Sequence, residues 1–300
     1  MNHSTAHFLP FDATNIDDPS VLHIQRKINE SPESRTRCLE IIRKKSGNLV
    51  GIEPCLDGNF LLRFLRVSKF DTSKALKRLE KYYKQNDVVL DALKDTFLSP
   101  QKAQGINHLL LCPYRMKDNS LLLIGQRRGL DYTQINFAQR FYTEIIAFNG
   151  LFENPLNQIC GFSFILDFEG FQFSDLTVFT PGWVRLFTDT VLSAYPCRTK
   201  AVYIVNAPTP FRILYRMVYP FVSKKLHDRV SFHYSNDNWQ SLHDLIPVDI
   251  LPDLYNGKVR TGALINCLEN KEELDKKFRE IFVYGYSKTK QRRQCMKVLC

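Results

Sequence analysis

The sequence predicts an α/β protein with a mainly parallel sheet and crossover helices, preceded by a small all-helical domain. Three observations predict this class. The first hundred residues contain mixed charged and apolar runs at helical spacing. After Pro100, short apolar runs alternate with helical segments, as in a sheet whose parallel strands are joined by helices. Of the 300 residues, 44% are hydrophobic, which is enough apolar material for a large core.

The composition excludes several classes of protein. Charged residues make up 24% of the chain and hydrophobic residues 44%. Disordered proteins contain fewer hydrophobic residues, so we expect a folded protein. No stretch approaches the roughly 18 consecutive apolar residues of a membrane-spanning helix. The first residues lack the basic and apolar regions of a signal peptide, and we expect a cytoplasmic protein. The eight cysteines form no C-x-x-C pair, so we expect reduced thiols and no structural metal.

The N-terminal domain, which we place at residues 1–98, is expected to be helical. Residues 34–45 and 72–84 mix charged and apolar side chains at helical spacing. Between them, residues 60–65 carry an apolar stripe at positions i, i+1, i+4 and i+5. Such a stripe is typical of a helix that packs in a small bundle.

The second domain, which we place at residues 99–284, is expected to hold the sheet. Strands are expected at residues 108–112, 121–127, 162–168, 201–205 and 230–234. The run at 201–205 is continuously apolar, as in a strand buried on both faces. Helices are expected at residues 142–152 and 180–194, and another begins at Thr209, a candidate cap, and Pro210. Residues 285–300 form a separate basic C-terminal tail in this prediction.

The sequence lacks the common catalytic motifs. It contains no G-x-G-x-x-G after a strand, no P-loop and no G-x-S-x-G elbow. The His-Asp pairs at residues 227–228 and 243–244 are interpreted as surface polar residues, because adjacent side chains point apart. Asp167 and Glu169 alternate at a strand end, but capping and turn hydrogen bonds explain two carboxylates better than catalysis does. We therefore expect no enzyme activity, no catalytic residue, no cofactor and no metal.

The positive charge is concentrated in two segments. The formal net charge is +10; residues 198–229 hold seven Lys or Arg and one acid, and residues 285–300 hold five and none. This distribution favours docking to an anionic membrane over diffuse binding of polyanions, and no nucleic-acid partner is expected. Residues 211–221 combine an apolar helix face with Arg212 and Arg216, which suits a membrane interface. The same pattern also fits an ordinary surface helix packed on the core.

Several motifs, in order along the chain, resemble the CRAL-TRIO lipid-binding family. They are LDFEG at residues 166–170, YP at 195–196, IVNAPTPF at 204–211, YPF at 219–221 and LPDLYNG at 251–257. NFLLRFLR at residues 59–66 resembles the helical domain that precedes this domain in the family. The resemblance extends over residues 20–260 and is greatest to members that carry tocopherol or retinaldehyde. Asn256 stands where the family usually has glycine, but Asn tolerates left-handed backbone well, so we expect the turn to form.

The resemblance implies a carrier with one apolar cavity that is closed by a movable helical gate at residues 209–221. The implied ligand is a tocopherol, a retinoid or another isoprenoid or lipid, exchanged when the gate opens at a phosphoinositide-containing membrane. The resemblance thus implies a cytoplasmic monomer that associates reversibly with membranes. The alternative is a phosphoinositide-sensing scaffold that binds membranes or proteins and transfers no ligand.

The resemblance also implies three sets of site residues. Four basic residues match a phosphoinositide cleft of the tocopherol-binding members, and Arg and Lys suit multiply charged phosphates; the alternative is ordinary surface charge. They are Arg198, Lys200, Lys225 and Arg229. The expected pocket residues are Phe141, Glu144, Ile145, Phe148, Phe162, Leu166, Phe173, Phe179, Phe187, Thr190, Val191 and Val202. The expected gate residues are Phe211, Leu214, Met217, Val218 and Phe221.

Glu144 falls where two kinds of family member place a contact to the ligand head group. Other head-group contacts of those members fall on Phe148, Leu166 and Leu186, which are apolar here. We therefore interpret Glu144 as a polar anchor for a hydroxyl or an amine. If its carboxyl is buried and unpaired, it should titrate at high pH. The alternative is a solvent-facing glutamate on the helix expected at residues 142–152.

Overall fold

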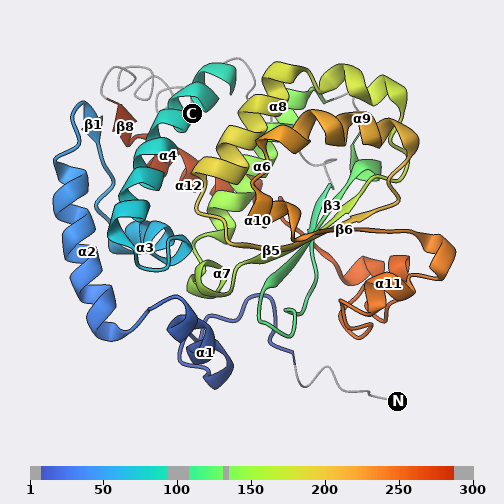
Figure 1. Ribbon diagram of the computed structural model, residues 1–300, viewed down its shortest axis with the longest axis horizontal. Coiled ribbons are helices and arrows are strands. Elements are labelled where there is room, and N and C mark those ends of the chain that lie inside the picture. The colour runs from blue at the N-terminus through green and yellow to red at the C-terminus, as the bar shows by residue number, and fades with distance from the viewer. Residues whose placement is uncertain (1–7, 94–107, 131–134, 287–300) are drawn as a thin grey trace.

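The computed structural model describes residues 8–93, 108–130 and 135–286. The predicted domain boundary at residues 98 and 99 lies outside these ranges, as does most of the predicted tail. Figure 1 shows a helical unit beside a sheet that is covered by further helices.

Four helices form the described part of the N-terminal unit, in agreement with the sequence. They are α1 (Pro19–Lys27), α2 (Pro32–Gly47), α3 (Gly58–Val67) and α4 (Thr72–Leu93). Polar side chains fix where they begin: Ser31 and Ser34 form a reciprocal capping box at α2, and Asp57 accepts from the Phe60 N–H at 2.9 Å. The apolar stripe of residues 60–65 is buried between α2 and α4.

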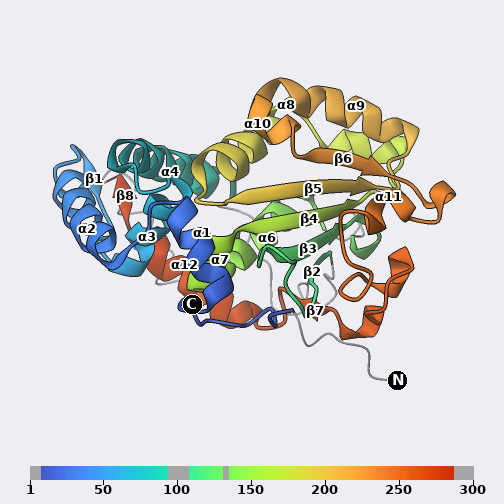
Figure 2. The ribbon, with the colours of Figure 1, turned by 60° about the horizontal axis from the view of Figure 1, so that its bottom comes forward.

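The sheet has six strands within the described residues, in the order β6-β5-β4-β3-β2-β7. They are β2 (Leu109–Leu111), β3 (Leu121–Gln126), β4 (Phe162–Asp167), β5 (Thr199–Val205), β6 (Val230–His233) and β7 (Ile265–Asn266). The pairings among β3, β4, β5 and β6 are parallel, whereas β2 is antiparallel to both of its neighbours. Figure 2 shows the strands stacked in this order. The predicted mainly parallel sheet with crossover helices is confirmed.

The two faces of the sheet have different covers, because side chains alternate along each strand. The helices α6 (Phe137–Leu151), α7 (Pro155–Cys160) and α8 (Pro181–Phe187) cover one face. There Leu121 and Leu123 of β3 join a core that extends into the N-terminal unit. On the opposite face, Leu122 and Ile124 pack with the segment 239–264, which contains α11 (Gln240–His243).

The helix expected at residues 180–194 is divided in two. Thr180 is the cap of α8 rather than its first residue, because its hydroxyl accepts from the Trp183 N–H at 3.3 Å. Beyond Phe187 the chain continues as a π-helix, η3 (Thr188–Ala194), in which the Tyr195 N–H bonds to the carbonyl of Thr190 at 2.9 Å. The wider helix packs against α4.

The chain returns to the N-terminal unit near its end. The helix α12 (Lys271–Phe282) packs against α6, and β8 (Gly285–Tyr286) pairs antiparallel with β1 (Ile52–Glu53). The sequence assigns Gly285 and Tyr286 to the basic tail, whereas the structure uses them in a strand. Residues 287–300 lie outside the described ranges.

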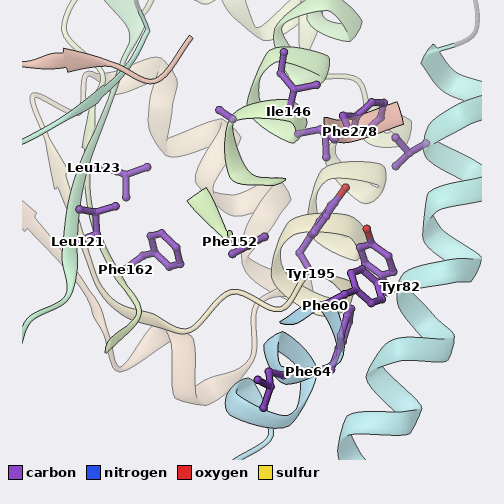
Figure 3. Packing of buried hydrophobic residues seen from close by; sticks show 14 of the residues in the cluster. Phe60, Phe64, Tyr82, Leu121, Leu123, Ile146, Phe152, Phe162, Tyr195 and Phe278 are labelled. Carbon is purple, nitrogen blue, oxygen red and sulfur yellow. The ribbon is translucent and has the colours of Figure 1, made fainter. Parts of the chain in front are cut away.

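A chain of aromatic rings joins the N-terminal unit to the sheet (Figure 3). Phe60 of α3 contacts Tyr82 of α4, with ring centroids 5.8 Å apart, and Tyr82 contacts Tyr195 at 5.4 Å. Tyr195 stacks on Phe152 at 6.3 Å, which in turn meets Phe162 of β4 at 5.7 Å. The two units therefore share one apolar core, and separating them would expose large aromatic surfaces to water.

A buried ion pair forms a polar contact at the same boundary between the N-terminal unit and the sheet domain. The guanidinium of Arg66 contacts the Glu30 carboxylate at 2.7 Å, and both side chains are at most 3% exposed. Arg66 also donates to the side chain of Gln158 in α7, at 2.6 Å. Arg35 contacts the same carboxylate at 3.0 Å, but its side chain is 31% exposed.

We expect replacement of Arg66 to destabilise the protein much more than replacement of Arg35. Arg66→Leu leaves Glu30 in the core without its main partner, which should lower the free energy of unfolding by about 3 kcal/mol. Arg35→Leu removes a partly exposed partner and should cost about 1 kcal/mol or less. Urea unfolding of both variants checks this, and equal losses would contradict it.

Candidate functional site

A cavity of about 270 Å³ lies on the helix-covered face of the sheet. Its floor comes from β3, β4 and β5, and its walls come from α6, the α8–η3 region and α9 (Thr209–Val218). Several residues singled out from the sequence line it: Glu144, Phe148, Leu166, Phe179, Phe187, Val191, Val202, Phe211, Leu214 and Val218. The lining is predominantly aromatic and aliphatic.

Seven residues expected in the pocket or gate do not line this cavity. They are Phe141, Ile145, Phe162, Phe173, Thr190, Met217 and Phe221. Phe162 is fully buried against Phe152, and Thr190 is fully buried in the π-helix. Phe173 and Phe221 instead face water, with 63% and 50% of their surface exposed.

The geometry of α6 explains the misplaced residues of that helix. Glu144 and Phe148 are four residues apart and share the face that meets the cavity. Phe141 and Ile145 also form an i, i+4 pair, but that pair lies on a neighbouring face and is 1% exposed in the core. An apolar pattern alone does not distinguish these two buried faces.

The structure adds wall residues that the sequence prediction missed. Phe168 and Phe171 follow β4, and the Phe168 ring lies 4.0 Å from the ring of Phe211. Leu226 and His227 come from α10 (Lys224–His227), which follows the gate. His227 is thus a cavity residue, whereas the sequence interpretation places it among surface polar residues. All four lie in irregular or very short segments, which carry little periodicity.

One end of the cavity is polar. Glu144 is 9% exposed, and its carboxylate accepts from the Arg140 Nε at 2.9 Å. The Nε2 of His108, which directly precedes β2, lies 3.7 Å from the same carboxylate. The Arg140 guanidinium also stands over the rings of Phe137 and Phe179, 5.9 and 5.8 Å from their centroids.

This pairing corrects the expected titration of Glu144. Burial opposes its charged form, but the Arg140 guanidinium and His108 outweigh burial, so the pKa of the carboxyl lies below its usual value. The prediction of a high pKa assumed an unpaired carboxyl. For His108, burial is the larger influence, and it lowers the pKa of the imidazole despite the neighbouring Glu144.

The helix α9 covers the cavity with one face and meets water with the other. Phe211 and Leu214 are 4% and 5% exposed, whereas Ile213 on the outer face is 44% exposed. The helix begins after Pro208, and Thr209 makes no capping hydrogen bond, contrary to the sequence expectation. After α9, Tyr219 in η4 (Tyr219–Phe221) is 52% exposed, so apolar surface continues onto the outside of the gate.

A buried carboxylate anchors the start of the gate. Asp167, at the end of β4, accepts from the Arg128 guanidinium at 2.7 Å, from the Asn206 amide at 3.0 Å and from the Tyr255 hydroxyl at 3.0 Å. Asn206 has a left-handed φ of 52°, three residues before the gate segment begins. Asp167 therefore has a structural role, consistent with the interpretation by hydrogen bonding rather than catalysis.

The LPDLYNG turn forms as expected despite its departure from the family pattern. Asn256 adopts a left-handed conformation, with φ 55°. At Gly257 a side chain is excluded, because a Cβ would lie 1.9 Å from the Leu251 carbonyl oxygen. The turn places Tyr255 where its hydroxyl reaches Asp167.

Three of the four predicted phosphoinositide residues gather near the gate. Arg198 and Arg229 donate to the backbone carbonyls of Ile159 and Thr199, so the fold holds both guanidinium groups in place. Burial first, and then the charges of Arg229, Lys69, Arg198 and Arg78, lower the pKa of the exposed Lys225 ammonium. Lys69 and Arg78 belong to the N-terminal unit, and the sequence prediction did not include them.

The structure separates Lys200 from this basic cluster. Its ammonium pairs with Asp118 at 3.1 Å, and it lies in a depression with Ala201 and Tyr203 on the opposite face of the sheet. Strict alternation would place Lys200 on the face of Val202, but the β4–β5 register shifts at Phe162 and Ser163. We define the basic cluster as Lys69, Arg78, Arg198, Lys225 and Arg229.

Comparison with known protein families finds one match, which lies in the sheet-containing part of the chain. The family model described as CRAL/TRIO domain matches residues 127–257, which contain α6, α9 and strands β4 to β6. Over these residues the chain is similar to the CRAL/TRIO family. Members of this family bind or transfer lipids, and the matched residues include most of the lining of the apolar cavity.

The chain is also similar to individual proteins. Clavesin-2 of Rattus norvegicus and of Homo sapiens are each 27% identical over 250 residues, which cover 77% of this chain and 71% of the relative. Clavesin-1 of Xenopus laevis is 27% identical over 242 residues, covering 77% and 70%. The crystal structure of Sfh5 aligns with a TM-score of 0.42 and 14% identity, over 77% of this chain and 90% of that one. Among the described residues, no helix is long and apolar enough to cross a membrane.

At the polar end of the cavity we expect Arg140 to control the ionisation of Glu144. Ionised Glu144 stabilises the wild type above the unfolded-state pKa of about 4.3, and this contribution is lost as the pH falls through the lower folded-state pKa. In Arg140→Leu, burial raises that pKa, so the ionised carboxyl costs stability as the pH rises.

The destabilisation caused by Arg140→Leu should therefore be larger at pH 7 than at pH 4. Urea unfolding at a series of pH values measures it. In the matched double variant Arg140→Leu/Glu144→Gln, this pH dependence should disappear. A loss in the single variant that is the same at every pH would contradict the assignment.

Proposed function

We propose that the protein binds one hydrophobic lipid in the cavity beneath α9 and releases it at an anionic, phosphoinositide-containing membrane. The observation that carries this proposal is the apolar cavity itself, which is closed on one side by an amphipathic helix. Each methylene that a ligand buries there contributes about 0.8 kcal/mol, so a hydrocarbon chain suffices for firm binding without any covalent chemistry.

The size and lining of the cavity favour a ligand with a single hydrocarbon chain. A volume of about 270 Å³ is at the lower end of ligand pockets, which span roughly 300–1,000 Å³. Rings from Phe148, Phe164 and Phe187 line it, and such walls suit a rigid, unsaturated chain. We propose a tocopherol-, retinoid- or other isoprenoid-like lipid on this basis.

Two surface features support release at a membrane. The basic cluster lies beside α10 and offers several cations to phosphate groups, each worth about 1 kcal/mol near an anionic leaflet. Tyr219 and Phe221 are half exposed at the end of the gate, where aromatic rings can enter the lipid interface. We propose that the protein resides in the cytoplasm, binds membranes reversibly and opens α9 there about the segment at Asn206.

The second candidate function is a phosphoinositide-sensing scaffold that transfers no ligand. The basic cluster favours it, because Lys69 and Lys225 are exposed regardless of what the cavity holds. The two functions differ in whether the cavity is filled in the working protein.

Native mass spectrometry of the freshly purified protein, followed by organic extraction, should find a bound lipid. The variant Val218→Trp places a large ring in the cavity. The fraction of this variant that carries lipid should be at least tenfold lower than in the wild type. Its matched control on the same helix is Ile213→Trp, which points outward and should retain the lipid. A wild-type protein that is always empty would favour the scaffold.

Loss of the two exposed lysines of the basic cluster should weaken membrane binding. At about 1 kcal/mol each, Lys69→Ala/Lys225→Ala should bind vesicles containing phosphatidylinositol bisphosphate roughly 30-fold more weakly. Co-sedimentation measures this affinity. The charge-matched control is Lys44→Ala/Lys45→Ala, on the exposed surface of α2.

Vesicles with the same surface charge from phosphatidylserine separate a specific site from general attraction. A loss confined to the phosphoinositide vesicles supports a head-group site. Equal binding by the variant and the control on every vesicle would overturn the cluster as a membrane contact.

A further inference from the structure

His108 is a buried polar side chain with unused hydrogen-bonding capacity inside the cavity. It lines the cavity and is 2% exposed. Among the described residues, neither Nδ1 nor Nε2 has a hydrogen-bond partner. A buried polar group without a partner loses its hydrogen bonds to water and gains none in return, so native proteins rarely keep one. The imidazole therefore indicates a partner that the protein chain does not supply.

The charged side chains near His108 form ion pairs with one another, so their charges cancel. The Glu144 carboxylate is paired with Arg140 at 2.9 Å, and Arg127, which also lines the cavity, is held by two bonds of 2.8 and 2.9 Å to Asp175. Both pairs are neutral in sum. A ligand group that enters here meets no net charge, but it meets an imidazole and an adjacent carboxylate.

The spacing leaves room for a group shared between these two residues. The Nε2 of His108 and the Oε1 of Glu144 are 3.7 Å apart, which is beyond a direct hydrogen bond. A hydroxyl beside both atoms can accept from the imidazole N–H and donate to the carboxylate. Among alcohol, ester and aldehyde head groups, only the alcohol performs both functions with a single atom.

We propose that His108 and Glu144 form a head-group subsite and that the ligand is a neutral lipid alcohol. This inference rests on the proposed function, because it requires that the cavity bind a lipid. An acidic lipid is disfavoured because its carboxylate would lie against that of Glu144. An ester or aldehyde only accepts hydrogen bonds and leaves the carboxylate without a donor. An amine would carry a positive charge next to Arg140.

Competition among lipids with one hydrocarbon chain tests the head-group preference. The full-length protein is loaded with diphenylhexatriene, a fluorescent hydrocarbon, which is then displaced by oleyl alcohol, oleic acid or methyl oleate. We expect oleyl alcohol to bind roughly tenfold more tightly than methyl oleate, with oleic acid weaker still. Equal or tighter binding of oleic acid or methyl oleate by the wild type overturns the subsite.

Variants then assign the preference to His108. In His108→Leu the advantage of oleyl alcohol over methyl oleate should fall about fivefold, a ratio measured within the variant and therefore independent of how tightly it binds diphenylhexatriene. His108→Gln keeps a donor and an acceptor and should retain most of the preference. A loss that is the same for both lipids in His108→Leu overturns the role of the imidazole. Failure of the wild type to bind diphenylhexatriene overturns the proposed function itself.

Discussion

The aromatic packing between the N-terminal unit and the sheet is the contact on which the candidate site depends. The rings of Tyr82, Tyr195 and Phe152 connect α4 to the region behind the cavity without a polar gap. This packing brings Lys69 and Arg78 close to Arg198 and Lys225, although these residues are more than a hundred positions apart in the chain. The shared apolar core thus holds the cations of the N-terminal unit beside those of the sheet domain. Together they form a strongly basic surface.

The function that we propose requires a cover of the cavity that is stable in water yet separable from the sheet. The helix α9 meets this requirement by placing Phe211 and Leu214 inward and leaving Ile213 exposed. Its entry segment is restrained by the bond between Asn206 and the buried Asp167, which also holds Arg128 and Tyr255. Because Asp167 links β4, the gate and the C-terminal turn, the family motifs at 166–170, 204–211 and 251–257 meet at one carboxylate.

The polar end of the cavity shows how charge is kept in an apolar environment. A single buried carboxylate would be neutralised by protonation, but the Arg140 guanidinium favours its ionised form. Ring contacts with Phe137 and Phe179 hold that guanidinium at the cavity wall. The charges are therefore fixed before a ligand enters, so a head group meets an ordered set of hydrogen-bonding atoms rather than mobile side chains.

The sequence by itself determined the α/β class and the helical unit, because periodicity and motif order are local properties. It also determined the left-handed turn at Asn256, which depends on one residue type. Only the tertiary structure decided that Glu144 and Phe148 face the cavity while Phe141 and Ile145 face the core, because both pairs have the same helical spacing. Tertiary structure likewise placed His108 beside Glu144, removed Lys200 from the basic cluster through a register shift and added Lys69 and Arg78. These outcomes depend on contacts between segments far apart in the chain, and no local pattern contains them.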